Sequence, residues 1–320
     1  MVMQKNKKYD IVGIGNAIVD LIAEVDDSYL EKNSINKGSM SLVDYDVANR
    51  IGDEVDIVKT ISGGSVANSI VCIAQQNLKT VFIGKVNQDE LGEKFAKGLA
   101  EENVEFKITK SLANKHTARC IILVSPDAER TMNTYLGVSQ ELTEEDVDLN
   151  IIEESSILYL EGYLWDLDNA KKAIKKSIST AINSETKIAF SISDAFCVDR
   201  FREEFIDLVN NSADIIFANE SEIKSLFETN ELNDAIKKCQ DTKKIFAVTL
   251  GDKGAKIIYK NEVVDIKAEV IDKLVDTTGA GDLFAAGFLA EYLKTQDLES
   301  SGKQGVKMAS IIIQQFGARI

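Results

Sequence analysis

The chain has 320 residues, and its 52 acidic and 37 basic side chains give a formal net charge of −15. A protein that binds nucleic acid needs a basic surface, because neutralisation of phosphates by Lys and Arg supplies most of the non-specific affinity. The charge therefore excludes nucleic acid as a partner. An acidic surface of this kind is typical of a soluble globular protein.

Histidine and cysteine content restricts the chemistry further. His116 is the only histidine, so a His-rich metal site is excluded and a Ser–His–Asp arrangement would have to include that residue. The four cysteines form no CxxC pair, which is typical of reduced thiols in a cytoplasmic protein. No apolar run approaches the ~18 residues of a membrane span, and the first residues lack a signal-peptide pattern. We therefore expect a cytoplasmic protein without a membrane partner.

Short β-branched runs alternate with longer amphipathic stretches. The pattern predicts strands at residues 9–15, 80–84, 104–108, 157–160, 187–192, 213–218 and 245–250. It predicts helices at residues 65–76, 90–102, 169–182, 283–293 and 306–316. Strands separated by helices of about 10–15 residues indicate a parallel sheet covered on both faces, which binds ligands at the carboxyl ends of its strands.

Two segments interrupt this alternation. Residues 18–43 and 115–135 contain strand-like pieces with no intervening helix, and their alternation suits an antiparallel sheet with one solvated face. We interpret them as two excursions, at about 16–45 and 112–137, that build one small β lid. The expected fold is a single α/β domain over residues 1–320, a three-layer α/β/α sandwich with a mostly parallel central sheet of about eight or more strands.

The strongest motif is DTTGAGD at residues 276–282, directly before a helical run. Gly279, Ala280 and Gly281 then fall at a helix N-terminus, where backbone amides lack intrahelical partners and the dipole favours negative charge. This suits a phosphate whose charge grows in a transition state. Asp282 would repel a merely bound phosphate, so we interpret it as a base that accepts the proton of an attacking hydroxyl. A helix-capping aspartate explains the spacing alone equally well.

Two other nucleotide-binding patterns are missing from the sequence. GIGNAI at residues 13–18 has isoleucine where the dinucleotide fingerprint has its third glycine, which disfavours a dehydrogenase. No G-x-x-x-x-G-K-[ST] pattern occurs either. Phosphate binding is therefore expected from the GAGD helix.

DTTGAGD resembles the carboxy-terminal signature of the ribokinase-like (PfkB) carbohydrate and nucleoside kinases. GGSVAN at residues 63–68 is similar to their GG-x-x-x-N signature, and NESE at 219–222 matches their N-x-x-E motif. The three motifs occur in the family's order and span nearly the whole chain. Within the family, GIGNAIVD resembles the opening of adenosine kinases, because Asn16 and Asp20 stand four residues apart, whereas ribokinases place the corresponding residues closer together. The TARC stretch and AERTMN show the same similarity.

The resemblance implies a ribokinase-like fold and roles for the residues that match its motifs. Asp282 would be the catalytic base, with Gly279, Ala280 and Gly281 as the anion hole and Arg130 of the lid reaching the transferring phosphate. Phosphoryl transfer needs mainly positioning and charge stabilisation, so this set suffices without histidine.

The same resemblance implies where ATP and cations bind. ATP would lie against Asn219, Thr249, Gly251 and Gly254. Asn219 and Glu222 would position Mg²⁺ through water, which fits the preference of this ion for few carboxylates. Two further residues, Asp276 and Thr278, resemble a monovalent-cation site for K⁺.

The acceptor pocket follows in the same way. A ribose or sugar presents vicinal hydroxyls that a carboxylate accepts in pairs, while Asn both donates and accepts. The residues that would hold these hydroxyls are Asn16, Asp20, Gly63, Gly64 and Asn68. The resemblance places Met40, Cys120, Leu136, Trp165 and Phe196 near a nucleoside, whose flat ring favours stacking. A place in the core is the alternative for Trp165 and Phe196.

These features predict an ATP-dependent kinase that phosphorylates a hydroxymethyl hydroxyl, with the 5′-hydroxyl of adenosine or a related nucleoside as the favoured acceptor. A sugar such as fructose, ribose or 2-keto-3-deoxygluconate is the alternative acceptor. A non-catalytic nucleoside- or sugar-binding protein is the alternative of another class, and it would not need Asp282 beside both glycines. We also expect the lid strands to pair between two subunits, because an open β edge tends to be covered.

Overall fold

The computed structural model describes residues 7–111, 115–127 and 129–320. Within these residues the larger sheet has nine strands in the order β14-β13-β12-β11-β10-β9-β1-β5-β6. Its strands are β1 (Tyr9–Ile14), β5 (Thr80–Asn87), β6 (Glu105–Ser111), β9 (Ser155–Glu161), β10 (Lys187–Ser191), β11 (Ile215–Asn219), β12 (Ile245–Thr249), β13 (Ala255–Tyr259) and β14 (Glu262–Ile266). Neighbours pair in parallel except β12 with β13 and β13 with β14. The mostly parallel sheet is therefore confirmed, with one antiparallel hairpin at its edge.

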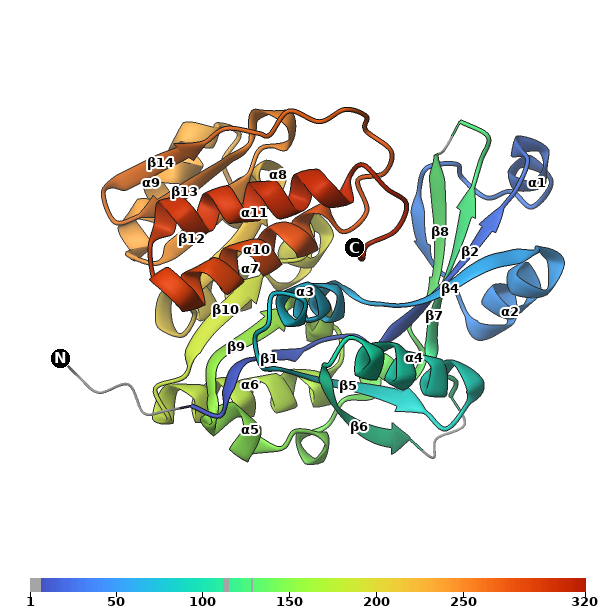
Figure 1. Cartoon of the computed structure of the whole chain (residues 1–320), viewed down its shortest axis with the longest axis horizontal. Coiled ribbons are helices and arrows are strands. Elements are labelled where there is room, and N and C mark those ends of the chain that lie inside the picture. Colours follow the sequence, from blue (N-terminus) through green and yellow to red (C-terminus); the bar gives the residue numbers. More distant parts are fainter. Residues whose placement is uncertain (1–6, 112–114, 128) are drawn as a thin grey trace.

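Helices cover both faces of this sheet (Figure 1). One face carries α5 (Leu149–Glu153), α6 (Asp168–Asn183), α7 (Ala195–Asn211), α8 (Glu220–Leu226) and α9 (Leu232–Thr242). The other carries α3 (Ser65–Ala74), α4 (Glu90–Glu101), α10 (Ala280–Thr295) and α11 (Leu298–Ile312). Short 3₁₀ turns lie at η1 (Gly137–Glu141), η2 (Glu144–Asp146), η3 (Gly162–Trp165) and η4 (Gly251–Lys253).

The apolar residues of the central strands explain these layers. Successive residues of a strand point to opposite faces, and in β1 Ile11 packs under α3 and α10 while Val12 packs on the α5–α9 side. Helix α10 is apolar nearly all round because it lies between α3 and α11. A Cβ at Gly287 would lie 2.5 Å from the carbonyl oxygen of Gln304, so a glycine there permits the close packing of α10 on α11.

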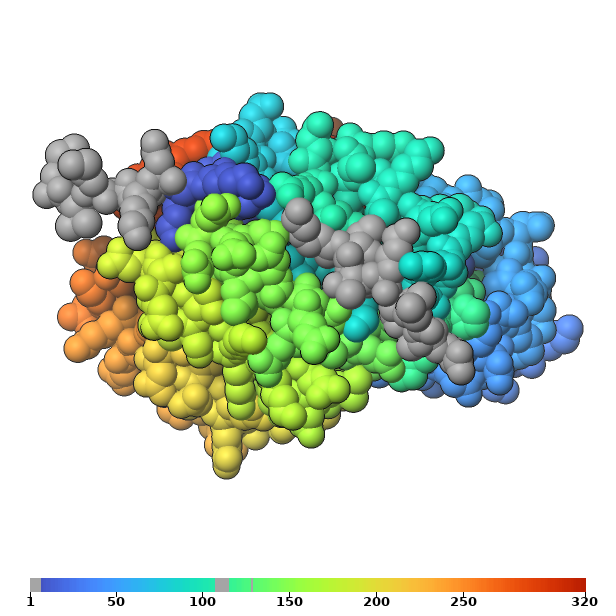
Figure 2. Space-filling view, turned by 90° about the horizontal axis from the view of Figure 1, so that it is seen from below, coloured from blue at the N-terminus to red at the C-terminus, as the bar shows by residue number. Residues whose placement is uncertain are grey.

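The second sheet forms the lid, in the order β3-β8-β7-β2-β4. Its strands are β2 (Ile18–Glu24), β3 (Met40–Leu42), β4 (Ile57–Gly63), β7 (Ala118–Val124) and β8 (Arg130–Tyr135). Helices α1 (Asp27–Lys32) and α2 (Tyr45–Glu54) pack on one face of it, against Ala23, Ile121 and Leu123. The lid lies at one end of the molecule, drawn in blue at the right of Figure 2.

Three expectations about the lid need correction. Its first part runs to residue 63 and not 45, because β4 pairs with β2. It contains two helices, and it is not antiparallel throughout, since β2 pairs in parallel with β7 and β3 with β8. The parallel pairs join strands from different excursions, a long-range choice that local alternation does not encode. Of the expected second part, residues 112–114 and 128 lie outside the described residues.

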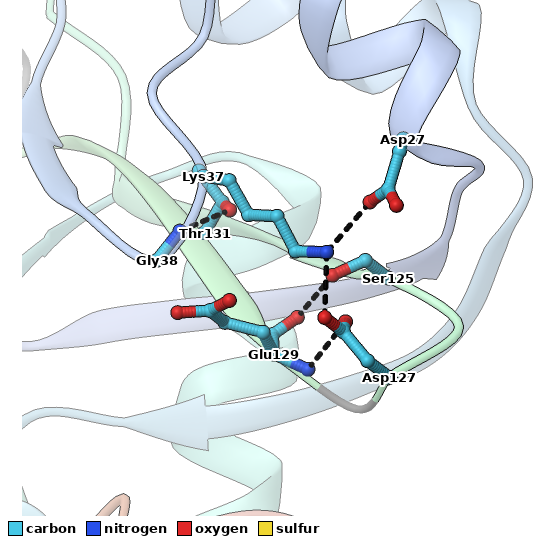
Figure 3. Close-up of polar contacts among 7 residues, drawn as sticks. All are labelled: Asp27, Lys37, Gly38, Ser125, Asp127, Glu129 and Thr131. Carbon is cyan, nitrogen blue, oxygen red and sulfur yellow. Dashed lines mark hydrogen bonds and ion pairs between the residues drawn. The ribbon is translucent and has the colours of Figure 1, made fainter.

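A lysine fastens the two excursions together (Figure 3). Lys37 Nζ lies 2.8 Å from Asp27 Oδ1 in α1 and 2.7 Å from Asp127 Oδ2 in the β7–β8 loop. The bond from Lys37 holds the pKa of the Asp127 carboxyl down at about 2. The backbone amide of Gly38 donates to Thr131 Oγ1 at 3.0 Å beside this pair. The lid is therefore one unit, although two distant segments build it.

Across residues 7–111, 115–127 and 129–320, the helices are all too short or too polar to cross a membrane.

Candidate active site

Two adjoining cavities lie at the carboxyl ends of the central strands, where parallel sheets bind ligands. The first, of about 240 Å³, is lined by residues that end β10, β11 and β12 and by Gly281 and Asp282 at the start of α10. The second, of about 360 Å³, extends from Gly281 between the loop after β12 and helix α11. Thr249, Gly281 and Phe284 line both cavities, so the start of α10 separates two parts of one site.

Asp282 is held by side chains of a neighbouring helix. Its Oδ1 accepts a bond from Ser65 Oγ at 2.6 Å, and its Oδ2 accepts one from Asn68 Nδ2 at 3.1 Å. No side chain caps α10, so the reading of Asp282 as a helix cap is wrong. Burial raises the pKa of the Asp282 carboxyl to about 6, and these two bonds together with the Arg319 charge limit the rise. The carboxylate can accept a proton near neutral pH.

The backbone before Asp282 leaves amides for an anion. Gly279 is the N-cap of α10 with φ 77°, a left-handed conformation that favours glycine. The Ala280 amide donates to Thr277 O at 3.1 Å, whereas the amides of Gly281 and Asp282 fall in the first turn and have no intrahelical acceptor. A Cβ built on Gly281 meets nothing within 4 Å, so the space before these amides is open. Of the expected anion hole, the Ala280 amide is therefore engaged, whereas the amides of Gly281 and of Asp282 are available to an anion.

Gly63 and Gly64 are each required at their position, but for different structural reasons. A Cβ at Gly63 would lie 2.5 Å from Asp20 Oδ2, so Gly63 lets the lid carboxylate approach. Gly64 has φ 100°, and a Cβ there would collide with the carbonyl oxygen of Asn16. Asp20 lies opposite Cys120 in the β2–β7 pair. Burial raises the pKa of Asp20 to about 7, while the charges of Arg319 and Arg130 oppose the rise.

Asn16 is held in place by Glu161, a residue that the sequence did not indicate. Glu161, at the end of β9, is fully buried, and its Oε1 accepts bonds from the backbone N and Nδ2 of Asn16, both at 2.9 Å. Its Oε2 accepts a bond from the Val66 amide at 3.0 Å, which ties α3 to the same carboxylate. Burial raises the pKa of Glu161 to about 7. Asn16 Oδ1 is buried and accepts no bond from the described residues, so it can accept a ligand hydroxyl. The available signal was a carboxylate at the end of the strand expected at 157–160.

Arg130 reaches the site from β8. Its Nη2 lies 2.9 Å from Asp276 Oδ2, and both side chains are buried, at 7% and 5% exposure. No Arg130 nitrogen makes a well-directed hydrogen bond to the described residues. A buried guanidinium with unused donors is suited to bind phosphate oxygens.

The residues expected to hold K⁺ do not fit that ion in this structure. Asp276 Oδ1 accepts bonds from the backbone N and Oγ1 of Thr278 at 3.0 and 2.7 Å. Its Oδ2 accepts a bond from the Gly317 amide at 3.0 Å and faces Arg130. The guanidinium supplies the positive charge that a potassium ion would bring, and it would repel such an ion.

The N-x-x-E motif forms a capping box at the start of α8. Asn219 donates through its backbone N to Glu222 Oε2 at 2.8 Å and through Nδ2 to Oε1 at 2.6 Å, and the Glu222 amide donates back to Asn219 Oδ1 at 2.9 Å. Both residues nonetheless line the first cavity, and burial raises the pKa of Glu222 to about 7. The described residues contain no group of three or more His, Cys, Asp or Glu that could hold a metal. This donor set fits a hydrated Mg²⁺, which keeps several waters.

The residues expected to contact ATP lie together. Thr249 pairs in register with Asn219, and Gly251 and Gly254 follow with φ values of 63° and 90°. Thr249, Gly251 and Gly254 all line the second cavity together with Gly281. Much of the remaining wall is apolar and suits a flat ring; it includes Ile271, Leu274, Val306 and Ile313.

The residues expected around a nucleoside base are divided by the structure. Cys120 lies beside Asp20 on an apolar lid face with Ile22 and Ile122. Trp165 is 2% exposed and packs on Phe190 and Phe205, so its expected contact with a ligand is wrong. The others are spread over the surface: Met40 is exposed on β3, Phe196 is exposed at the start of α7, and Leu136 is half-buried after β8.

Arg319 also reaches the site, and nothing in the local sequence FGARI indicates it. Its Nε donates to Asn68 Oδ1 at 3.1 Å, and its charge acts on both Asp20 and Asp282. Burial lowers the pKa of Arg319 to about 10. Figure 1 shows the segment after α11 running between the main sheet and the lid, which brings this residue to the site.

Comparisons with known proteins agree with this geometry. The model of the pfkB family carbohydrate kinases matches residues 10–320. A probable sugar kinase from Rhizobium etli CFN 42 has a structure with a TM-score of 0.91 at 39% identity, and the match covers 98% of this chain and 95% of that one. The adenosine kinase of Sinorhizobium meliloti gives a TM-score of 0.90 at 41% identity, covering 98% and 96%. The adenosine kinase of Saccharomyces cerevisiae is 26% identical, covering 96% and 95%. The chain belongs to the pfkB family of carbohydrate kinases and is a phosphotransferase that acts on an alcohol group.

Proposed function

We propose that the chain transfers the γ-phosphoryl group of ATP to the 5′-hydroxyl of adenosine or a related nucleoside. The observation that carries this proposal is the half-buried Asp282 carboxylate, held by Ser65 and Asn68 beside the open amides at the start of α10. A proton acceptor and an anion site on adjacent residues are what attack of a hydroxyl on a phosphoryl group requires.

Different residues contribute to different parts of the phosphoryl transfer. As the acceptor oxygen bonds to the γ-phosphorus, its proton passes to Asp282 and the bond from that phosphorus to the bridging oxygen of ADP breaks. A pKa of about 6 leaves Asp282 ionised at pH 7 and still able to accept the proton. The Gly281 and Asp282 amides and Arg130 stabilise the charge on the transferring group. Glu222 and Asn219 would hold a hydrated Mg²⁺, whose charge would offset that of the phosphates.

The acceptor side supports a nucleoside. Asp20 and Asn68 face the site with Asn16 Oδ1, and carboxylate and amide groups suit the vicinal hydroxyls of ribose. The lid face that carries Asp20 is apolar at Ile22, Cys120 and Ile122, and an apolar surface suits a base better than a free sugar. The 41% identity to an adenosine kinase agrees with this choice.

A sugar kinase is the second candidate, because the similarity to a probable sugar kinase is nearly as strong, at 39% identity. An ATP-consumption screen over adenosine, inosine, ribose, fructose and 2-keto-3-deoxygluconate decides between them. We expect kcat/KM for adenosine to exceed that for the free sugars by at least about 100-fold, because the apolar lid face beside Asp20 gains nothing from a sugar alone. Activity on a free sugar only would overturn the nucleoside proposal and leave the kinase assignment intact.

Asp282→Asn tests the role of the base. The amide keeps the shape of the side chain and cannot accept the proton, so we expect kcat to fall by at least about 100-fold while the KM for the acceptor changes little. The matched control is Asp297→Asn, the same change at the N-cap of α11, where asparagine also caps. A near-normal kcat in Asp282→Asn would refute the assignment.

The lid carries a further proposal, a homodimer. Met40 and Leu42 of edge strand β3 and Val58 of edge strand β4 are exposed, at 49%, 57% and 60%, and open apolar edges tend to pair. Light scattering at working concentration checks it, and a monomer would contradict it.

A further inference from the structure

Asn68 has one orientation in this structure, and its contacts with Arg319 and Asp282 agree on it. A guanidinium only donates hydrogen bonds, so the atom of Asn68 that faces Arg319 Nε at 3.1 Å is the carbonyl oxygen Oδ1. The other end of the amide is then Nδ2, which donates to Asp282 Oδ2 at 3.1 Å. An ionised carboxylate only accepts hydrogen bonds, so Asp282 favours the same orientation, and Arg319 holds the amide from its other end.

The charge of Arg319 also acts on two carboxylates from different parts of the fold. Asp20 comes from lid strand β2 and Asp282 from α10, and the charge of Arg319 acts on both. Two like charges in a low-dielectric site disfavour each other's ionised form. The positive charge of Arg319 counters this repulsion.

The position of Arg319 depends on glycine and alanine in the segment before it. The Gly317 amide donates to Asp276 Oδ2, and a Cβ at Gly279 would lie 2.7 Å from the Ala318 Cβ, so this segment packs directly against the start of α10. Arg319 Nη2 is buried and has no partner among the described residues. Arg319 is half-buried, and its Nε bonds Asn68 while Nη2 keeps an unused donor; the Glu102 carboxylate also acts on its charge.

We propose that Arg319 is a positioning residue for phosphoryl transfer, which fixes the amide of Asn68 against Asp282 and supplies the positive charge shared by Asp20 and Asp282. The inference rests on the proposed function, in which Asp282 is the base. It adds a residue outside the three motifs, from a segment that follows the last helix.

The other ionisable groups near Asp282 do not replace this charge. Those whose charges interact with Asp282 are Asp20 of β2, Tyr159 and Glu161 of β9, and Tyr163 of η3. All four are neutral or negative, so in this set only Arg319 favours the ionised base. Loss of a nearby opposite charge raises the pKa of a carboxyl, by about 1 unit for a close pair.

The test compares Arg319→Met with Arg319→Lys. Methionine keeps the length of the side chain and removes the charge and the donors, whereas lysine keeps the charge. For Arg319→Met we expect kcat at pH 7 to fall by about tenfold and the acidic limb of the pH profile of kcat to move upward by about 1 pH unit. Arg319→Lys should return the acidic limb of the pH profile to its wild-type position. It should recover only part of kcat, because an ammonium group cannot hold the Asn68 amide as the planar guanidinium does. Ile320→Ala, a change at the exposed neighbour, is the control and should leave both unchanged.

A double-mutant cycle examines the path through Asn68. Because Arg319 acts on Asp282 partly through Asn68, Arg319→Met should lower kcat less in an Asn68→Ala background than in the wild type. Equal losses in the two backgrounds would contradict the positioning role. A wild-type pH profile in Arg319→Met, or a loss of kcat with an unmoved limb, would overturn the inference.

A second measurement does not need activity. Asp20 and Asp282 bind protons more tightly in the folded state than in the unfolded state, so stability falls as pH rises. Arg319→Met should steepen this fall between pH 6 and pH 8 in thermal unfolding, and an unchanged slope would count against the shared charge. If the wild type phosphorylates none of the acceptors, the proposed function fails, and this slope still decides whether Arg319 serves the two carboxylates.

Discussion

Asp282 and Asp20 show how burial gives carboxylates uses that a surface carboxylate lacks. Burial raises the pKa of Asp282 to about 6 and that of Asp20 to about 7, while the donors around Asp282 keep it from rising further. A base with a pKa near 6 is ionised at neutral pH and can still take up a proton. The chain maintains this state at a cost in stability, since a charge is held away from water.

The cost at Asp282 is measurable. Its folded pKa lies above the unfolded value of 3.8, so the native state binds the proton more tightly and stability falls as pH rises from about 4 to about 6. Asp282→Asn removes the charge, and we expect the free energy of unfolding at pH 8 to rise by about 1–2 kcal/mol, with no gain at pH 4. Urea unfolding at both pH values measures this. Asp297→Asn should change the free energy of unfolding in the opposite direction. The bond from Ser300 lowers the pKa of Asp297, so we expect this variant to lose stability at pH 8.

At the scale of single elements, the starts of α3 and α10 are built for different purposes. Helix α3 begins at Gly64, whose backbone no other residue adopts without a clash, and it presents Ser65, Asn68 and Ser69 to Asp282. Helix α10 begins at Gly279 and presents amides to open space. One helix therefore orients the base and the other provides the anion site.

Gly281→Ala separates the anion site from the fold. The added methyl has no protein atom within 4 Å, so the folded state is not strained and helix propensity favours alanine by up to about 1 kcal/mol. The methyl would instead occupy the place of the phosphate, and we expect kcat/KM for ATP to fall by about 10–100-fold. Steady-state kinetics and thermal unfolding check both halves. Gly52→Ala in α2, where the nearest atom lies at 3.8 Å, is the control and should keep full activity. Unchanged kinetics in Gly281→Ala would place the phosphate elsewhere.

At the scale of the whole molecule, a net charge of −15 opposes the approach of a nucleotide that is itself an anion. Long-range fields are screened beyond about 8 Å at physiological ionic strength. The proposed binding therefore depends on local groups, namely the amides of α10, Arg130 and the hydrated metal site at Glu222.

This charge predicts an unusual salt dependence. Raising ionic strength from about 10 to 150 mM should increase the association rate of MgATP by about twofold, because screening removes the repulsion between like charges. Stopped-flow binding in choline chloride measures the rate without introducing a metal cation. A decrease with salt would show that a local positive field dominates the approach instead.

The sequence by itself determined the sheet, its covering helices and the location of the phosphate chemistry. Apolar runs with helical and strand periods are local, and a glycine-rich turn before a helix offers amides wherever it occurs. The sequence therefore predicted that Gly279 and Gly281 stand at the start of α10. It also indicated a lid, whose extent and strand directions it left wrong.

Tertiary structure alone decided which distant residues complete the site. Glu161 and Arg319 lie 145 and 251 residues from Asn16 and Asn68, the partners they hold, and no local period links such positions. The predicted ligand contact of Trp165 failed for the same reason. The local sequence around an aromatic residue does not show whether it faces a ligand or, as here, packs on Phe190 and Phe205. Periodicity reports which face of an element is buried, and only the packing of the elements decides what that face meets.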